Sequence, residues 1–304
     1  MNEIVDIAFY TVPVFILLIA IEIFALSRER NEEKMKHKGY SWRDSATSVS
    51  IYGIGRVVNP LGGRFIALPI VLIFSMLTPM HLSPSSPWVW VLAIVGVDLS
   101  YYWQHRLQHR VRFLWAAHSV HHSSQHFNMT TAIRLSWLIP GSFLVAVVDI
   151  PLALIGIPAW MIFLSHTIVL LFQFPIHTEK IGKLPDFIEF IFNTPSHHRV
   201  HHGVNNPYLD KNYAGILIVW DRLFGTYAHE IEPVRYGLTR NIDTHNPIKA
   251  NYHEFVAMVR DVRKARSWRG RVAYILGPPG FSETQSEVAA DAHIRGSDKV
   301  LQDS

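Results

Sequence analysis

Three short histidine clusters in this 304-residue chain repeat at the spacing of an α-helix. They are His105-Arg-Leu-Gln-His109, His118-Ser-Val-His121-His122 and His198-Arg-Val-His201-His202. Positions i, i+3 and i+4 share one face of a helix, so each cluster would direct its imidazoles toward a common point. Imidazole is a common ligand for iron, zinc and copper, and stacked imidazoles contribute little to an apolar core. The pattern therefore predicts helices that share a metal site.

The chain as a whole is apolar enough for a membrane, with 49% hydrophobic and 17% charged residues, against about 25% charged in a typical soluble domain. Five apolar stretches approach the roughly 20 residues that a membrane helix needs: about 4–26, 65–80, 89–103, 136–155 and 158–174. A buried helix of a soluble protein is the alternative for any one stretch. Together they predict an all-α integral membrane protein with four to five transmembrane helices.

Lysine and arginine predict the orientation of these helices, because they collect on the cytoplasmic side. Basic residues from Arg28 to Lys38 follow the first stretch, which argues against a signal peptide and places that end inside. Segments 105–134 and 177–304 are also basic, whereas loop 80–87 has no Lys or Arg. We expect an outside N-terminus and a cytoplasmic site, in a bacterial inner membrane or, in a eukaryote, the endoplasmic reticulum. The basic loops explain the pI near 9.2, so no nucleic-acid partner is expected.

One domain is expected over residues 1–281, followed by a polar, disordered tail at 282–304. Residues 27–62 are a polar, basic connection whose amphipathic pattern suits the membrane interface. A histidine-rich helical cap, made of 105–135 and 177–230, is expected on the cytoplasmic side. Within it, Thr194-Pro195 is a helix-start signal just before the third cluster.

The clusters supply eight candidate ligands, more than one transition-metal ion uses. Two ions with about four or five nitrogens each fit this number better. His177, which ends the fifth apolar stretch, is a further candidate ligand. His166 lies deeper and suits a contact between helices, and His126 extends the face of the second cluster. The chain has no cysteine, which excludes disulfides and thiolate ligands.

Three other residues are candidates for supporting the ligands. Asp98 shares a helical face with His105 and His109, and a carboxylate inside a membrane helix is a functional candidate. It could accept a hydrogen bond from a ligand histidine or join two helices. Gln173 is a candidate supporting group or weak ligand. His197 is out of phase with its cluster by about 100°, but could ligate or bridge from the start of the helix.

Longer strings around the clusters resemble the fatty acid hydroxylase and sterol desaturase superfamily of membrane di-iron enzymes. The strings are Asp98–Trp103 leading into His105, Trp115–Ser124, Gln173–Glu179, Asn193–Gly203, Asp210–Gly215 and Trp220–Thr226. They cover about residues 90–230, and they look closest to the alkylglycerol monooxygenase branch and its bacterial relatives.

This resemblance implies two iron ions held by His105, His109, His118, His121, His122, His198, His201 and His202, with O2 as co-substrate. Other branches carry a further His-x-x-x-His pair, where this chain has Gln173 and His177. The resemblance leaves tetrahydrobiopterin, used by animal enzymes of the branch, as a candidate cofactor, although no residue pattern identifies a pterin pocket. No flavin, haem or iron–sulfur motif is evident, so an external electron donor is expected, either a protein or a small reductant.

The predicted function is O2-dependent hydroxylation of a lipid in the bilayer, with desaturation or oxidative ether cleavage as alternative outcomes. The rival is a metal-binding membrane protein without redox chemistry, such as a zinc-dependent hydrolase or a metal carrier. A carrier should place its metal groups near the middle of the bilayer, whereas these clusters follow the ends of the apolar stretches.

Overall fold

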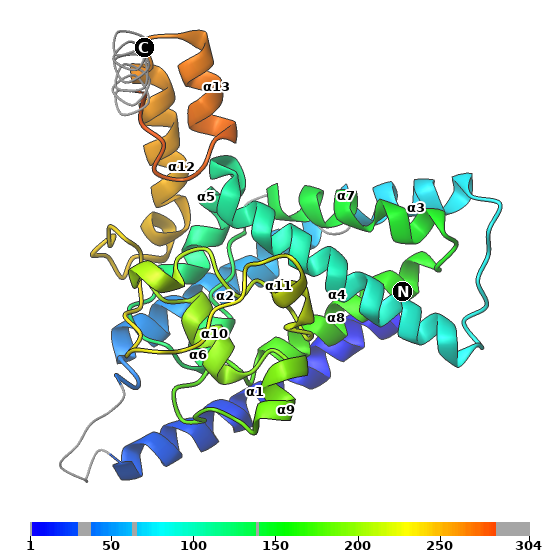
Figure 1. Cartoon of the computed structure of the whole chain (residues 1–304), viewed down its shortest axis with the longest axis horizontal. Coiled ribbons are helices and arrows are strands. Elements are labelled where there is room, and N and C mark those ends of the chain that lie inside the picture. Colours follow the sequence, from blue (N-terminus) through cyan, green and yellow to red (C-terminus); the bar gives the residue numbers. More distant parts are fainter. Residues whose placement is uncertain (1, 30–37, 63–65, 138–139, 284–304) are drawn as a thin grey trace, which may run out of the picture.

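The computed structural model describes residues 2–29, 38–62, 66–137 and 140–283 of the chain. Over these ranges every regular element is a helix, and the two isolated β-bridges join loop segments without forming a sheet. The all-α prediction is thus confirmed for the described residues. Figure 1 shows the long helices α1, α4 and α8 slanting across the molecule, with the short helices α6, α9, α10 and α11 lying against them near its middle and left.

The helices have the following bounds: α1 Asn2–Glu29, α2 Trp42–Gly62, α3 Leu68–Leu77, α4 Pro87–Arg110, α5 Arg112–His122, α6 Met129–Ala132, α7 Pro140–Leu154, α8 Ala159–Gln173, α9 Asp186–Ile191, α10 Pro195–His201, α11 Val219–Leu223, α12 Pro247–Lys264 and α13 Trp268–Leu276. A 3-10 turn spans Asn206–Tyr208. Several starts follow local signals, since proline occupies the first turn of α3, α4, α10 and α12, where its missing N–H is not needed.

An apolar bundle of α3, α4, α7 and α8 forms the main core. Val97 of α4, Ala146 of α7 and Ile162 of α8 are fully buried in one cluster. Gly96 lets α7 approach closely, because a Cβ there would lie 2.7 Å from Leu152 Cδ2. A turn joins the fourth and fifth stretches: α7 ends before Gly156, whose φ of 92° suits glycine.

Among the described residues, one helix is long and apolar enough to cross a membrane by length and composition. This is α1, whose window Thr11–Arg28 has a mean hydropathy of 2.0. The other apolar helices are shorter, namely Leu68–Leu77, Phe143–Leu154 and Ala159–Gln173. In the described part of the second expected span, 65–80, the ten-residue α3 follows two π-helical residues at 66–67, while α4 continues beyond the third span to Arg110. Four to five spans therefore remain a prediction.

The expected connection 27–62 contains a complete helix, α2, while residues 30–37 lie outside the described part of the chain. The predicted tail also lies outside it from residue 284 onward. Helix α2 contributes to a buried ion pair that holds the end of α5. Arg134 donates to Asp44 Oδ1 at 2.9 Å and to Ser123 Oγ at 3.0 Å, and Ser124 Oγ donates to Asp44 Oδ2 at 2.6 Å. Ser123 and Ser124 directly follow the second histidine cluster, so this network fixes its position.

Helix α1 is joined to the same end of the molecule through Glu22, which is 3% exposed. Its carboxylate accepts hydrogen bonds from Met129 N at 2.9 Å, from Tyr40 Oη and from Thr178 Oγ1. Thr178 follows His177, so α1 is attached next to a candidate ligand.

Candidate metal centre

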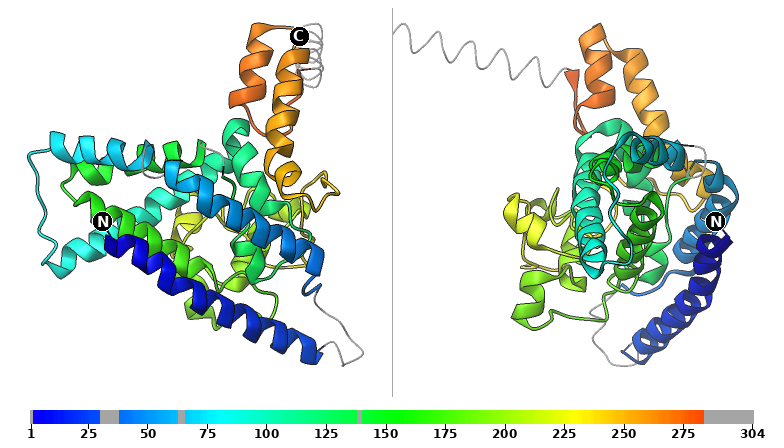
Figure 2. Two further views of the ribbon diagram at one scale, coloured as in Figure 1. Left: turned by 180° about the vertical axis from the view of Figure 1, so that it is seen from behind. Right: turned by 90° about the vertical axis from the view of Figure 1, so that its right-hand side faces the viewer.

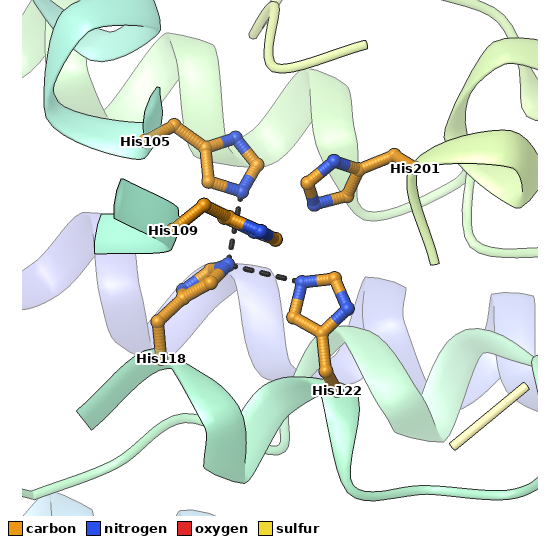
Figure 3. A group of neighbouring side chains, drawn as sticks. All are labelled: His105, His109, His118, His122 and His201. Atoms are coloured by element: carbon orange, nitrogen blue, oxygen red, sulfur yellow. Dashed lines mark hydrogen bonds between the residues drawn. The ribbon is translucent and has the colours of Figure 1, made fainter. Parts of the chain in front are cut away.

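Nine histidines that are distant in sequence come together at one end of α4. They form two groups, and within each group the ligand nitrogens all lie within 4.8 Å of one another. The first group is His105, His109, His118, His122 and His201, and the second is His121, His177, His198 and His202. Figure 3 shows the first group, whose side chains point toward one another from α4, α5 and α10. All eight cluster histidines and the further candidate His177 are included.

Local structure explains why the rings converge. Helix α4 carries His105 and His109 on its last turns, as the periodicity predicted. Val111 then takes an extended conformation (φ −116°, ψ 116°) and starts α5 in a new direction. Thr194 precedes α10 as its N-cap residue, with Pro195 at the first helical position, which confirms the expected helix start. His177 lies just beyond the end of α8.

The inner side of the centre consists of imidazole Nε2 atoms. In the first group His118 Nε2 lies 2.9 Å from His105 Nε2 and 3.1 Å from His122 Nε2. In the second group His177 Nε2 lies 2.8 Å from His198 Nε2 and 3.2 Å from His121 Nε2. A neutral ring nitrogen either donates or accepts, so such crowded nitrogens cannot all be satisfied by one another.

Three further Nε2 atoms, those of His109, His201 and His202, are buried without any hydrogen-bond partner. Leaving a buried polar atom unpaired costs about 1–3 kcal/mol each. A metal ion bound by lone pairs of these nitrogens would remove that cost. The donor set thus fits metal ions that accept neutral nitrogen ligands.

On the outer side, backbone carbonyls orient the rings. The Nδ1–H of His105 donates to Tyr213 O at 2.8 Å, that of His177 to Gln173 O at 2.7 Å, and that of His201 to Lys211 O at 3.0 Å. Each bond fixes the tautomer that leaves Nε2 as the metal-facing nitrogen. His109 instead has Nδ1 at 3.6 Å from Asp210 Oδ1.

The loop that supplies Lys211 O and Tyr213 O is itself held by two buried carboxylates. Asp221 accepts from Tyr213 N and Ala214 N, both at 2.8 Å. Asp98 accepts from Ile216 N at 2.6 Å, from Leu217 N at 3.0 Å and from Trp220 Nε1 at 2.9 Å. Of the two roles expected for Asp98, the bond to a ligand histidine is corrected, because its oxygens face this loop instead. The expected bond between helices is present, since Trp220 of α11 donates to Asp98 of α4.

Sequence reasoning missed Tyr213, Lys211 and Asp221 as supporting groups. The relevant groups of the first two are backbone carbonyls, which any residue type would supply. The loop does contain a local signal, since Asp210 and Asn212 adopt φ values of 59° and 56°, a left-handed conformation that asparagine and aspartate tolerate best.

Burial lowers the pKa of all nine imidazoles, because desolvation disfavours the charged ring. The pKa of His105 falls to about 3 and that of His177 to about 4. The rings are therefore neutral at physiological pH, the form that binds a metal without first losing a proton.

The other candidates lie outside the two groups. His197 points to Glu189, with Nε2 at 2.9 Å from Oε2, because its phase on α10 carries it away from its neighbours. Gln173 contacts Tyr101 Oη through its side chain and supports His177 through its carbonyl. His166 pairs with Asp149 of α7 at 2.6 Å, the expected contact between helices.

His126 does not extend the face of the second cluster, because α5 ends at His122. Its Nδ1 lies 3.2 Å from Gly39 O instead, so the ring belongs to neither metal-ligand group.

These observations define a chain whose regular elements are all helices in its described parts, with a buried, histidine-only candidate site for two metal ions. Residues 90–226 match the fatty acid hydroxylase family model, and this part of the chain is a domain of that family. The matched segment begins within α4 and ends after α11, so it contains all nine histidines of the centre.

Several relatives extend this likeness. Human alkylglycerol monooxygenase is 38% identical over 251 residues, covering 83% of this chain and 56% of the relative. The zebrafish alkylglycerol monooxygenase is 52% identical over 167 residues, covering 54% of this chain and 36% of the relative. An ornithine lipid hydroxylase of Rhizobium tropici is 32% identical over 143 residues, or 47% and 43% of the two chains. The chain spans about half the length of the curated relatives it matches. No solved structure matches it significantly.

Proposed function

We propose that this protein is a membrane-bound di-iron oxygenase that uses O2 to hydroxylate a lipid, with desaturation or oxidative ether cleavage as alternative outcomes. The observation that carries the proposal is the division of nine buried histidines into a group of five and a group of four. Five and four nitrogens suit two ions that each keep a position open for O2 or substrate. The relatives named as an alkylglycerol monooxygenase and a lipid hydroxylase support the same reaction class.

Iron is proposed over zinc because of the chemistry required. Zinc has no redox chemistry and takes four ligands in structural sites, whereas bound iron would supply the redox change that activates O2. The proposed ligands of one ion are His105, His109, His118, His122 and His201, and those of the other are His121, His177, His198 and His202. Because no flavin, haem or iron–sulfur motif is evident in the sequence, an external donor is proposed as the source of electrons.

The chain's own groups hold the ligands in place before any metal binds. The carbonyls of Tyr213, Lys211 and Gln173 orient three rings, and Asp221 holds the loop that carries two of these carbonyls. Burial keeps the rings neutral and excludes bulk water. Preorganisation of this kind reduces the cost of binding.

The proposed membrane placement puts α1, α3, α4, α7 and α8 in the bilayer, with the N-terminus outside and the histidines on the cytoplasmic side. Residues 1–281 would act as one oxygenase domain. In this placement α4 leads from the bilayer directly to His105 and His109, so the tail of a lipid can stay in the membrane while its reactive carbon reaches the centre. A bacterial inner membrane is the proposed location.

The test is metal content and O2-dependent lipid turnover of the full chain in detergent. About two irons per chain, with one oxygen atom added to the lipid under a reducing donor, would support the proposal. His202→Ala should lose the iron of its own group and all turnover but keep the iron of the other group, whereas His81→Ala, an exposed histidine outside both groups, should keep both irons and turnover. Zinc that iron cannot replace, with no O2 consumed, would favour a hydrolase or a metal carrier.

A further inference from the structure

Helices α12 and α13 form a hairpin that stands out from the helical body (Figures 1 and 2). In these views the hairpin runs across the direction of α4, α7 and α8. Helix α13 is the member of the pair on the side toward which the apolar helices extend. If α4, α7 and α8 span the bilayer, the hairpin lies parallel to the membrane plane, beside the ends that carry the histidines.

The outer face of α13 is apolar although it is exposed. Trp268, Val272 and Leu276 are spaced four residues apart and are 70%, 44% and 59% exposed. Gly270 and Tyr274 occupy the inner face, where Gly270 is buried. A stripe with this spacing gives a helix one continuous apolar side, and an exposed stripe of this kind marks an interaction surface.

The hairpin that carries the stripe is rich in basic residues. Residues 247–276 contain seven Lys or Arg and two acidic residues. Both acids are already engaged by Arg112 of α5, with Glu254 Oε1 at 2.8 Å and Asp261 Oδ2 at 2.7 Å. Arg269 and Arg271, both exposed, alternate with the apolar residues on α13. A helix that combines exposed tryptophan, aliphatic side chains and exposed arginines suits the headgroup layer of an anionic membrane.

We propose that the α12–α13 hairpin is an interfacial anchor that binds the anionic surface of the same membrane. The face formed by Trp268, Val272 and Leu276 enters the headgroup layer, and the basic side chains bind lipid phosphate groups. The inference rests on the membrane placement in the proposed function, but not on the identity of the metal or of the reaction.

Such an anchor would act on the site through α5. Helices α12 and α13 both pack on α5, and α5 carries His118, His121 and His122. Seating the hairpin on the surface would therefore set the depth of the histidine centre relative to the lipid tails.

The absence of cysteine makes the test direct, since a single introduced cysteine is the only labelling site. A nitroxide at Val272→Cys would be studied in the full chain in nanodiscs of phosphatidylcholine with phosphatidylglycerol. Its collision rates with O2, which partitions into lipid, and with a water-soluble nickel complex report its surroundings. Leu170→Cys on the exposed side of α8 is the lipid-facing control, and Arg240→Cys in a loop is the water-facing control.

We expect the label at Val272 to resemble that at Leu170 in anionic nanodiscs. It should shift several-fold toward the nickel complex in pure phosphatidylcholine or when Arg269 and Arg271 are both changed to glutamate. A water-exposed Val272 beside a lipid-exposed Leu170 would overturn the anchor and leave the membrane placement standing. A water-exposed Leu170 would overturn both.

Lipid-like shielding of Val272 could also come from protein. If the shielding persists in lipid-free detergent and disappears on dilution, a second copy of the chain covers the stripe and the anchor is overturned. If it persists there and disappears when residues 284–304 are removed, the C-terminal segment is the occupant, with the same consequence.

Discussion

Replacing His177 with alanine should remove one metal ion from the centre and leave the other in place. The two groups are unequal, so His177→Ala leaves three of four nitrogens, whereas His109→Ala leaves four of five. The His177 Nε2 lies 2.8 Å and 3.2 Å from the nearest Nε2 atoms of its group, a position at the middle of the donor set. Loss of a mere hydrogen-bond partner of a ligand costs about 10- to 100-fold in metal affinity. Loss of this direct ligand should exceed that range.

The assay is metal content after equilibration with a chelator of graded strength, followed by O2-dependent turnover. His177→Ala should fall from about two metals per chain to about one and lose turnover. His109→Ala should retain about two in weak chelator and release one only in stronger chelator. His81→Ala controls for the loss of a histidine as such. Two metals held by His177→Ala at the original affinity, or a greater loss in His109→Ala, would refute the division into five and four.

Three further outcomes follow from the structure. Asp221→Asn should loosen the loop that positions Tyr213 O, so metal affinity should fall by about 10- to 100-fold while the helical content stays unchanged. Chelator competition measures the affinity and circular dichroism the helical content, and an unaltered affinity would contradict this prediction. Gly215→Ala should destabilise the fold by about 1–3 kcal/mol, because the added Cβ would lie 2.6 Å from Asp98 Oδ1 and 2.6 Å from Val169 Cγ1. An unchanged thermal midpoint would argue against this packing. The metal-free protein should lose stability as the pH falls from 6.5, since His105 and His177 have pKa values of about 3 and 4 in the fold and the unfolded chain binds more protons. Between pH 6.5 and the pKa of the folded ring, each ring lowers the free energy of unfolding by about 1.4 kcal/mol per pH unit. Equal thermal midpoints at neutral and mildly acidic pH, measured with chelator present, would contradict this prediction.

Elements set by local signals were predictable from the sequence. Helix α4 runs through His105 and His109, and α10 starts at Pro195, because periodicity and capping act within a few residues. Membrane span lengths were less predictable. The described part of the stretch 65–80 yields the short α3, since the apolar composition of a segment does not determine where its helix begins and ends.

The sequence by itself determined the chemistry of the centre. The absence of cysteine excluded thiolate ligands, and histidines at i, i+3 and i+4 predicted imidazole donors on helix faces. Only the tertiary structure decided how they divide. It brought His177 into the second group, and it turned His197 toward Glu189. It also placed the carbonyl of Tyr213 behind His105. These choices depend on how α4, α5, α8 and α10 pack across about one hundred residues of chain, and helical periodicity carries no information about that packing.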